Sequence, residues 1–129
     1  MKIILLVTLF LNLAFCEIVV MVSHKNKLIK VTKKEIADVY LKKKTTIRGI
    51  SVIPIDNRKN YKEFCKKIMN KTPKQMRAHW ARELYRGTKK IRPKLKTDKQ
   101  IKIAINSNPK IISYSSNKLT GKIIFHISK

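Results

Sequence analysis

The sequence predicts a single, three-layered α/β domain with a mixed sheet of about four strands and four helices, in the order β-α-β-α-α-α-β-β. Four helix-start signals of one kind, at Thr32, Asn60, Thr72 and Thr97, recur along the chain. Short runs of β-branched residues lie between them. An apolar fraction of 43% over 129 residues is enough for one hydrophobic core. No repeat or linker divides the chain, so we expect residues 17–129 to form one domain.

The first 16 residues have the pattern of a secretory signal peptide. Lys2 precedes an apolar run over residues 3–15, and small side chains at Ala14 and Cys16 occupy the −3 and −1 positions of a cleavage site before Glu17. The run is short for a membrane-spanning helix. We therefore expect a periplasmic or secreted protein that begins at Glu17. The alternative is that Cys16 becomes a lipidated first residue, although the bulky Phe15 before it is atypical of lipoprotein signals.

Each helix-start signal pairs a Thr or Asn with a Glu or Gln three residues later, which is the capping-box pattern. The signals predict helices over residues 33–43, 61–69, 73–85 and 98–107. Pro73 suits the first position of the third helix, and Gly87 suits the position just past its end. At helical spacing, the expected buried faces are Ile36, Val39 and Tyr40; Phe64, Cys65, Ile68 and Met69; Met76, Trp80 and Leu84; and Ile101, Ala104 and Ile105.

The strands are expected between these helices. Residues 17–23 form a continuous β-branched run, typical of a strand buried on both faces. Residues 50–56 predict a second strand, with Pro54 at an edge or at a strand end. Residues 110–115 and 122–128 are expected to pair with each other across a loop that contains Asn117 and Gly121.

The chain is strongly basic, with a formal net charge of +24. Such a charge attracts nucleic acid, anionic lipid, lipopolysaccharide or acidic small molecules without specifying a fold. Of the 31 basic residues, 25 are Lys and only 6 are Arg. Arg would be favoured where bidentate phosphate contacts were selected, so much of this charge is typical of an AT-rich coding bias. Trp80 lies on an apolar helix stripe, which favours packing over base stacking, and we expect no specific nucleic-acid partner.

Catalytic groupings are missing from the sequence. The seven acids form no pair suited to general acid and base, and the three histidines lack metal-ligand spacing. Cys65 falls on an apolar helix face, as a buried structural thiol would. The sequence therefore predicts a protein that is not an enzyme and has no metal site and no cofactor.

One local segment suggests binding chemistry. The strand over residues 50–56 delivers Asn57, Arg58, Lys59 and Asn60 to the start of the helix over residues 61–69. Free backbone N–H groups and the positive end of a helix dipole favour an anion there. These four residues are our candidate anion site. The alternative is an ordinary capped turn with solvated charges, in which Asn60 is simply the cap.

The order of motifs resembles the substrate-binding protein of phosphate ABC transporters, a type 2 periplasmic binding protein, and especially its short, single-lobe secreted relatives. The likeness runs from Ile18 to about Ile127. In the family, a Leu-Thr-x-x-Glu-Leu helix is followed by a glycine-containing turn, a strand and a ligand loop, and later by a Pro-Gly-Ala-Ile-Gly-Tyr strand. The matching positions here are Ile29, Thr32, Glu35, Ile36, Val39, Tyr40, Leu41, Lys43, Thr45, Pro109, Ile112 and Tyr114.

The resemblance implies one lobe of a binding protein that takes phosphate or a related small anion in connection with ABC transport. It also implies a transporter permease, a sensor or an envelope protein as partner. The family's ligand loop is rich in Ser, Gly and Thr after an Arg, whereas "DNRKNY" stands in its place here. A single lobe binds weakly unless it forms a homo-oligomer or docks on a partner. The alternative function is a non-catalytic interaction or scaffold domain that docks an envelope protein or an acidic surface.

Overall fold

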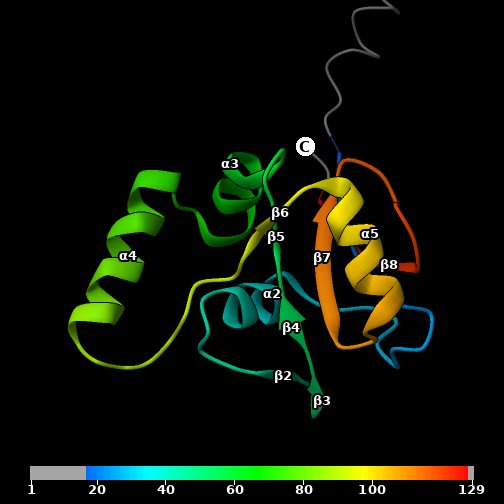
Figure 1. Ribbon diagram of the computed structural model, residues 1–129, viewed down its shortest axis with the longest axis horizontal. Coiled ribbons are helices and arrows are strands. Elements are labelled where there is room, and N and C mark those ends of the chain that lie inside the picture. The colour runs from blue at the N-terminus through cyan, green and yellow to red at the C-terminus, as the bar shows by residue number, and fades with distance from the viewer. Residues whose placement is uncertain (1–16, 128–129) are drawn as a thin grey trace, which may run out of the picture.

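The computed structural model describes residues 17–127, and the predicted signal peptide lies outside this range. As predicted, the domain combines four helices with a mixed main sheet (Figure 1). In chain order the elements are β1 Ile18–Val22, α2 Lys33–Tyr40, β2 Thr46–Ile47, β3 Ile50–Ser51, β4 Ile53–Pro54, β5 Asp56–Asn57, α3 Tyr61–Phe64 with a π-helical continuation η1 Cys65–Met69, α4 Pro73–Tyr85, β6 Leu95–Lys96, α5 Asp98–Ser107, β7 Ile111–Ser115 and β8 Lys122–Ile127.

The main sheet has the strand order β4-β7-β1-β8. β1 is antiparallel to both β7 and β8, and β4 is parallel to β7. The prediction that the last two strands pair with each other is therefore wrong. All five residues of β1 are buried, so this strand takes the central place and the two late strands add to its two edges. β2 and β3 form a small antiparallel pair, and β5 and β6 a small parallel one.

Side chains of β1 alternate between two hydrophobic cores, which gives the domain three layers. Ile18, Val20 and Val22 pack with residues of α2 and α3 in the larger core. Val19 and Met21 pack with α5 in the smaller core. Figure 1 shows α5 along one side of the main sheet and α2 on the other. A strand covered on both faces must be apolar at every position, which explains the continuous β-branched run.

Three of the four predicted capping boxes are present, at Thr32, Thr72 and Thr97. The prediction at Asn60 is wrong, because its side chain makes no capping hydrogen bond. The backbone explains the difference: Thr32 has an extended ψ of 161°, whereas Asn60 has ψ 11°. The Asn60 N–H donates to the Asn57 carbonyl oxygen (3.2 Å), so a tight turn holds this backbone out of the extended conformation that a cap requires.

Two helix predictions need correction at their C-terminal ends. The first helix ends at Tyr40 instead of residue 43, because Lys42 has a left-handed φ of 61°. In α4, Met76 and Trp80 pack against Leu41 and Cys65 as expected. Leu84 was expected on the same buried face, but it is 82% exposed because no other element of the described part of the chain reaches the end of this helix.

The strand predicted over residues 50–56 is broken into short pieces. Ile53 and Ile55 donate their N–H groups to carbonyl oxygens of Lys110 and Ile112 on the β7 side. The N–H groups of Asp56 and Arg58 instead donate to the carbonyl oxygens of Lys94 and Lys96, just before and within β6. Pro54 has no N–H to donate. It comes before Asp56, the first residue that pairs with β6, so at Pro54 only β7 is a neighbouring strand and the other side is an edge. This confirms the expected position of the proline.

Gly121, in the loop that connects β7 to β8, permits the close approach of this loop to the end of β1. It has φ +68°, and a Cβ atom there would lie 2.0 Å from the carbonyl oxygen of Val22. We expect Gly121→Ala to lower the free energy of unfolding by at least about 3 kcal/mol, measured by urea denaturation. Gly87→Ala is the matched control, because Gly87 has a similar φ of +67° and open space around it. Gly87→Ala should lower the free energy of unfolding by only roughly 1–2 kcal/mol, which is the cost of placing a residue with a Cβ in the left-handed conformation. Equal losses in the two variants would contradict the steric contact.

Candidate anion-binding site

The candidate site lies where β5 ends and the chain turns into α3. β5 is held in place by its parallel partner β6, with Asp56 opposite Leu95 and Asn57 opposite Lys96. The Asp56 N–H donates to the Lys94 carbonyl oxygen at 2.8 Å, and the Arg58 N–H to the Lys96 carbonyl oxygen at 2.9 Å. Residues from three parts of the chain, on β5, β6 and the start of α3, therefore fix the backbone of the turn.

Asn57 is fully buried and holds the turn together. Its Nδ2 donates to Asp98 Oδ1 (2.6 Å) and to the Tyr114 carbonyl oxygen (2.9 Å). Its Oδ1 accepts from the N–H of Lys59 at 2.9 Å. Since Asp98 Oδ1 also accepts from the Ser115 hydroxyl (2.9 Å), one amide links β5, β7 and the first turn of α5. In this arrangement Asn57 positions its neighbours and does not face solvent.

The N–H groups of the turn are used inside the protein. Those of Arg58, Lys59 and Asn60 donate to Lys96, to the Asn57 side chain and to the Asn57 carbonyl oxygen. The anion nest of free turn amides that the sequence suggested is therefore not formed by these three groups. An anion at this turn would therefore have to be bound by side chains. Arg58 and Lys59 are exposed, and Asn60 is half-buried.

Lys59 and Asn60, but not Arg58, border a surface hollow of about 320 Å³ lined by Lys59, Asn60, Lys62, Glu63, Lys66 and Lys67. Four of the six lining residues are lysines and one is an acid. Lys62 and Lys66 are four residues apart on consecutive helical turns, so both side chains lie on one face. We call this feature the lysine hollow. The three lysines beyond Lys59 were not recognised as site residues, because their convergence depends on how α3 and η1 follow the turn.

Asn60 brings an unused hydrogen-bonding group to the lysine hollow. Its Oδ1 atom is buried and has no hydrogen-bond partner among the described residues. Leaving a buried polar atom unpaired costs roughly 1–3 kcal/mol. Because Asn60 lines the hollow, its unpaired oxygen is a candidate acceptor for a ligand that carries a proton.

Asp56 is a second feature that the sequence did not reveal. It is 4% exposed, and the hydroxyl of Tyr114 donates to its Oδ1 at 2.7 Å. Burial raises the pKa of this carboxyl to about 7, although the Tyr114 hydrogen bond and the charges of Arg92 and Lys42 oppose that shift. An isolated Asp before Asn and Arg reads as an ordinary turn residue, so only the fold shows that its carboxyl is enclosed.

Aromatic rings connect this region to the larger core. The Tyr114 ring stacks on Phe64 of α3, with ring centroids 3.6 Å apart. The Tyr40 hydroxyl donates to the carbonyl oxygens of Ile55 (3.0 Å) and Ile112 (3.2 Å) and thereby joins α2 to β7 and to the strand that leads into the site. Burial raises the pKa of the Cys65 thiol to about 12, so this side chain is neutral and is not a nucleophile.

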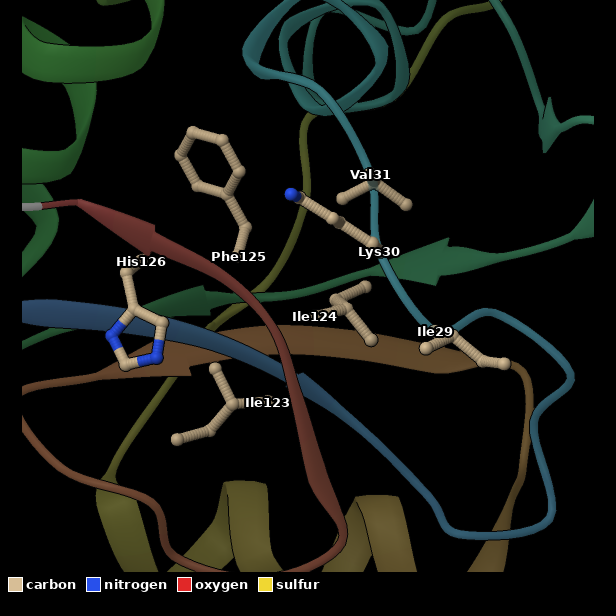
Figure 2. A pocket seen from close by; sticks show the side chains of 7 residues that line it. All are labelled: Ile29, Lys30, Val31, Ile123, Ile124, Phe125 and His126. Atoms are coloured by element: carbon tan, nitrogen blue, oxygen red, sulfur yellow. The ribbon is translucent and has the colours of Figure 1, made fainter.

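A second hollow, of about 450 Å³, lies at the opposite edge of the sheet. Figure 2 shows its lining, which comes from β8 and from the loop residues Ile29, Lys30 and Val31. The Val31 N–H donates to the Ile124 carbonyl oxygen (3.1 Å), so this loop covers part of the β8 edge. The lining is apolar except for Lys30 and His126, and it lacks the cluster of donors that a small anion needs. The lysine hollow is therefore the better candidate for an anion.

Residues 17–127 show neither a metal centre nor a membrane-spanning helix. No group of three or more His, Cys, Asp or Glu side chains in this range could hold a metal ion. No helix in the same range is both long enough and apolar enough to cross a membrane.

No family model matches the sequence, and no curated protein is recognisably similar in sequence. Solved structures do share the fold. A phosphate ABC transporter substrate-binding protein from Clostridium perfringens, with bound phosphate, superposes with a TM-score of 0.58 at 14% identity over 78% of this chain and 40% of its own. An ABC-type phosphate transport receptor from Vibrio cholerae gives 0.55 at 14% identity, over 87% of this chain and 46% of its own. PstS from Borrelia burgdorferi gives 0.55 at 13% identity, over 78% and 41%.

The chain spans less than half the length of each of these structures. At 13–14% identity the likeness shows the fold and not the ligand. The protein is thus an α/β domain with the architecture of about two-fifths of a phosphate-binding protein of the PstS type.

The enclosed carboxyl of Asp56 predicts a pH-dependent stability. A carboxyl whose pKa is about 7 in the folded protein and about 4 in the unfolded chain binds its proton more tightly when folded. Stability from this group is therefore complete below about pH 4 and falls as the pH rises to about 7. Asp56→Asn keeps an acceptor for Tyr114 and should remove this fall, which is on the order of 4 kcal/mol at most. Urea denaturation at a series of pH values measures it.

Tyr114→Phe is the companion variant. It removes the donor that favours the ionised Asp56, so the fall in stability should extend to higher pH than in the parent protein. If the free energy of unfolding depends on pH in the same way in the parent protein and in Asp56→Asn, then the pKa of the Asp56 carboxyl is not raised by burial.

Proposed function

We propose that this protein is a non-catalytic, solute-binding-like domain that binds phosphate or a related small anion in the lysine hollow. The observation that carries the proposal is the convergence of Lys59, Lys62, Lys66 and Lys67 on one hollow beside the unpaired Asn60 Oδ1. The fold supports it, because one structure with the same architecture contains bound phosphate.

The charges explain why an anion would enter. Four ammonium groups share this hollow with the single carboxylate of Glu63, so the local field attracts an anion. Lys provides a mobile point charge with three donors, which suits a small tetrahedral anion without fixing its orientation. Arg58 is exposed in the adjacent turn and adds to the same field. In this proposal Lys59 and Asn60 contact the ligand, Arg58 contributes its charge from the adjacent turn, and Asn57 positions the turn.

The Asn60 acceptor gives a basis for selectivity. Near neutral pH phosphate still carries a proton that it can donate, whereas sulfate carries none. An acceptor oxygen that is already buried can pair with the phosphate hydroxyl but meets only oxygen lone pairs from sulfate. A site that leaves a polar atom unpaired discriminates against ligands that cannot pair with it.

The signal peptide that the sequence predicts over residues 1–16 supports a setting for this binding. We propose a periplasmic or secreted protein that presents its anion to a transporter permease or a sensor. A surface hollow on one lobe encloses less of a ligand than a cleft between two lobes. Binding by the isolated domain should therefore be weak, with a dissociation constant of roughly millimolar order, and should tighten when a partner or a second copy covers the hollow.

Calorimetric titration with phosphate and with sulfate tests the proposal. We expect phosphate to bind more tightly than sulfate and expect Asn60→Ala to abolish that preference, because the acceptor is gone. The same variant should not be less stable than the parent, since the amide makes no capping bond. The double variant Lys62→Met with Lys66→Met should raise the dissociation constants of both anions roughly tenfold.

Lys102→Met is the matched control, because Lys102 is an exposed lysine on α5, away from the lysine hollow. It should leave both titrations unchanged. A protein that gives no heat with either anion at millimolar concentration is not a small-anion receptor. In that case the alternative function, docking of an envelope protein, would explain why the lobe is retained.

A further inference from the structure

The C-terminal end of α4 and the loop after it expose apolar and basic side chains together. Leu84 is 82% exposed, Tyr85 96% and Ile91 75%. Arg82, Arg86, Lys89 and Lys90 are also exposed. We call residues 82–91 the α4 tip. Figure 1 shows α4 standing apart from the main sheet, with the chain returning from its end to β6.

Only the first half of α4 is anchored. Met76 and Trp80 pack in a small core with Leu41 and Cys65, and none of the residues from 17 to 127 covers the same stripe one turn later at Leu84. A Leu, a Tyr and an Ile left in water forgo the hydrophobic stabilisation that burial would provide. Large apolar side chains gathered in this way indicate a surface that is covered when the protein is in use.

The charge of the α4 tip is concentrated and is of a special kind. From residue 82 to residue 91 there are four basic side chains and one acid, Glu83. Arg82 and Arg86 are two of the ten residues of the tip, although the whole chain has only 6 Arg against 25 Lys. Arg donates two parallel hydrogen bonds to phosphate oxygens, and its enrichment marks sites of phosphate recognition.

The tip is also built to hold its shape. Gly87, with φ +67°, ends the helix, and its N–H donates to the Leu84 carbonyl oxygen (3.1 Å). The Thr88 hydroxyl donates to the Glu83 carboxylate at 2.7 Å. The only acid of the tip is therefore hydrogen-bonded to the turn that follows the helix.

We propose that the α4 tip docks on the surface of an anionic phospholipid membrane, with Leu84, Tyr85 and Ile91 in the interfacial layer and the basic side chains on lipid phosphates. A bilayer presents anionic groups directly above an apolar interior, which matches both components of the tip. Tyr is favoured at that boundary because its ring is apolar and its hydroxyl is polar.

Other occupants match only one component. Nucleic acid offers phosphates but no apolar layer for Leu84 and Ile91. A second copy of the same tip would bring two strongly basic surfaces together, which opposes a symmetric dimer at this face. The proposal does not depend on the lysine hollow, because α4 and the hollow use different side chains.

A fluorescent probe at the tip tests the docking. In the full chain with Cys16→Ser, we substitute Tyr85→Cys and attach an environment-sensitive dye; the buried, neutral Cys65 should not react. The emission should shift to the blue with phosphatidylglycerol vesicles and stay unchanged with phosphatidylcholine vesicles. The same dye at Lys102→Cys on α5 should stay unchanged with both. This readout reports the position of the tip, whatever residues 1–16 do.

Two sets of substitutions separate the contributions, and their effect on vesicle binding is measured with the dye at the tip. Leu84→Ser with Ile91→Ser should lower binding at least about tenfold. Arg82→Gln, Arg86→Gln, Lys89→Gln and Lys90→Gln together should lower it at least about tenfold and remove its salt dependence. All six positions are exposed, so the fold should be retained, and the parent's circular dichroism spectrum checks this.

Three outcomes would overturn the proposal. Equal responses of the probes at the tip and on α5 would mean that another part of the chain meets the membrane. If the four Gln substitutions abolish vesicle binding and the two Ser substitutions leave it unchanged, binding is electrostatic attraction without insertion of the apolar side chains. A shift with duplex DNA and none with vesicles would identify nucleic acid as the occupant.

Discussion

The central position of β1 is the constraint on which the rest of the domain depends. This strand is buried at all five residues and hydrogen-bonds to β7 on one side and β8 on the other. Its alternate side chains contribute to both hydrophobic cores, so the helices on the two faces of the sheet are joined through one strand. Because β1 lies between β7 and β8, the loop connecting them must pass the end of β1, and only a residue without a Cβ fits at Gly121.

The candidate site combines a rigid base with an unsatisfied surface. Beneath the turn, Asn57 and Asp98 tie β5, β7 and α5 through short hydrogen bonds, and Asp56 is enclosed with Tyr114. Above it, Asn60 leaves a buried oxygen unpaired beside mobile lysines. Buried polar networks of this kind are stable when every member is paired. The residue that carries the unpaired group lines the surface hollow, and a binding site needs a rigid support beneath adaptable contacts.

The basic charge of the chain is not one uniform feature. Lys42–Lys44 follow the early end of α2 and lie in a turn, where Lys42 has a left-handed φ of 61°. The lysines of α3 and η1 share a hollow, and the arginines gather at α4. A small anion and an anionic membrane would thus meet different parts of the same domain. Charge counted over the whole sequence predicts attraction to anions, and only the placement of each side chain separates a binding surface from solvated charge.

The sequence by itself determined the helices, their starts and the apolar strands, because these depend on neighbours within a few residues. Capping boxes at Thr32, Thr72 and Thr97 are local hydrogen bonds, and β1 is apolar throughout because both of its faces are covered. Tertiary structure alone decided that β7 and β8 flank β1, that Asn60 is not a cap and that Leu84 is exposed. Each of these outcomes depends on a distant segment being present or absent: β1 between two late strands, β6 beside the turn, and nothing beside the α4 tip. Local pattern carries no information about such partners, since pairing between strands and the covering of a face are settled by competition across the whole chain.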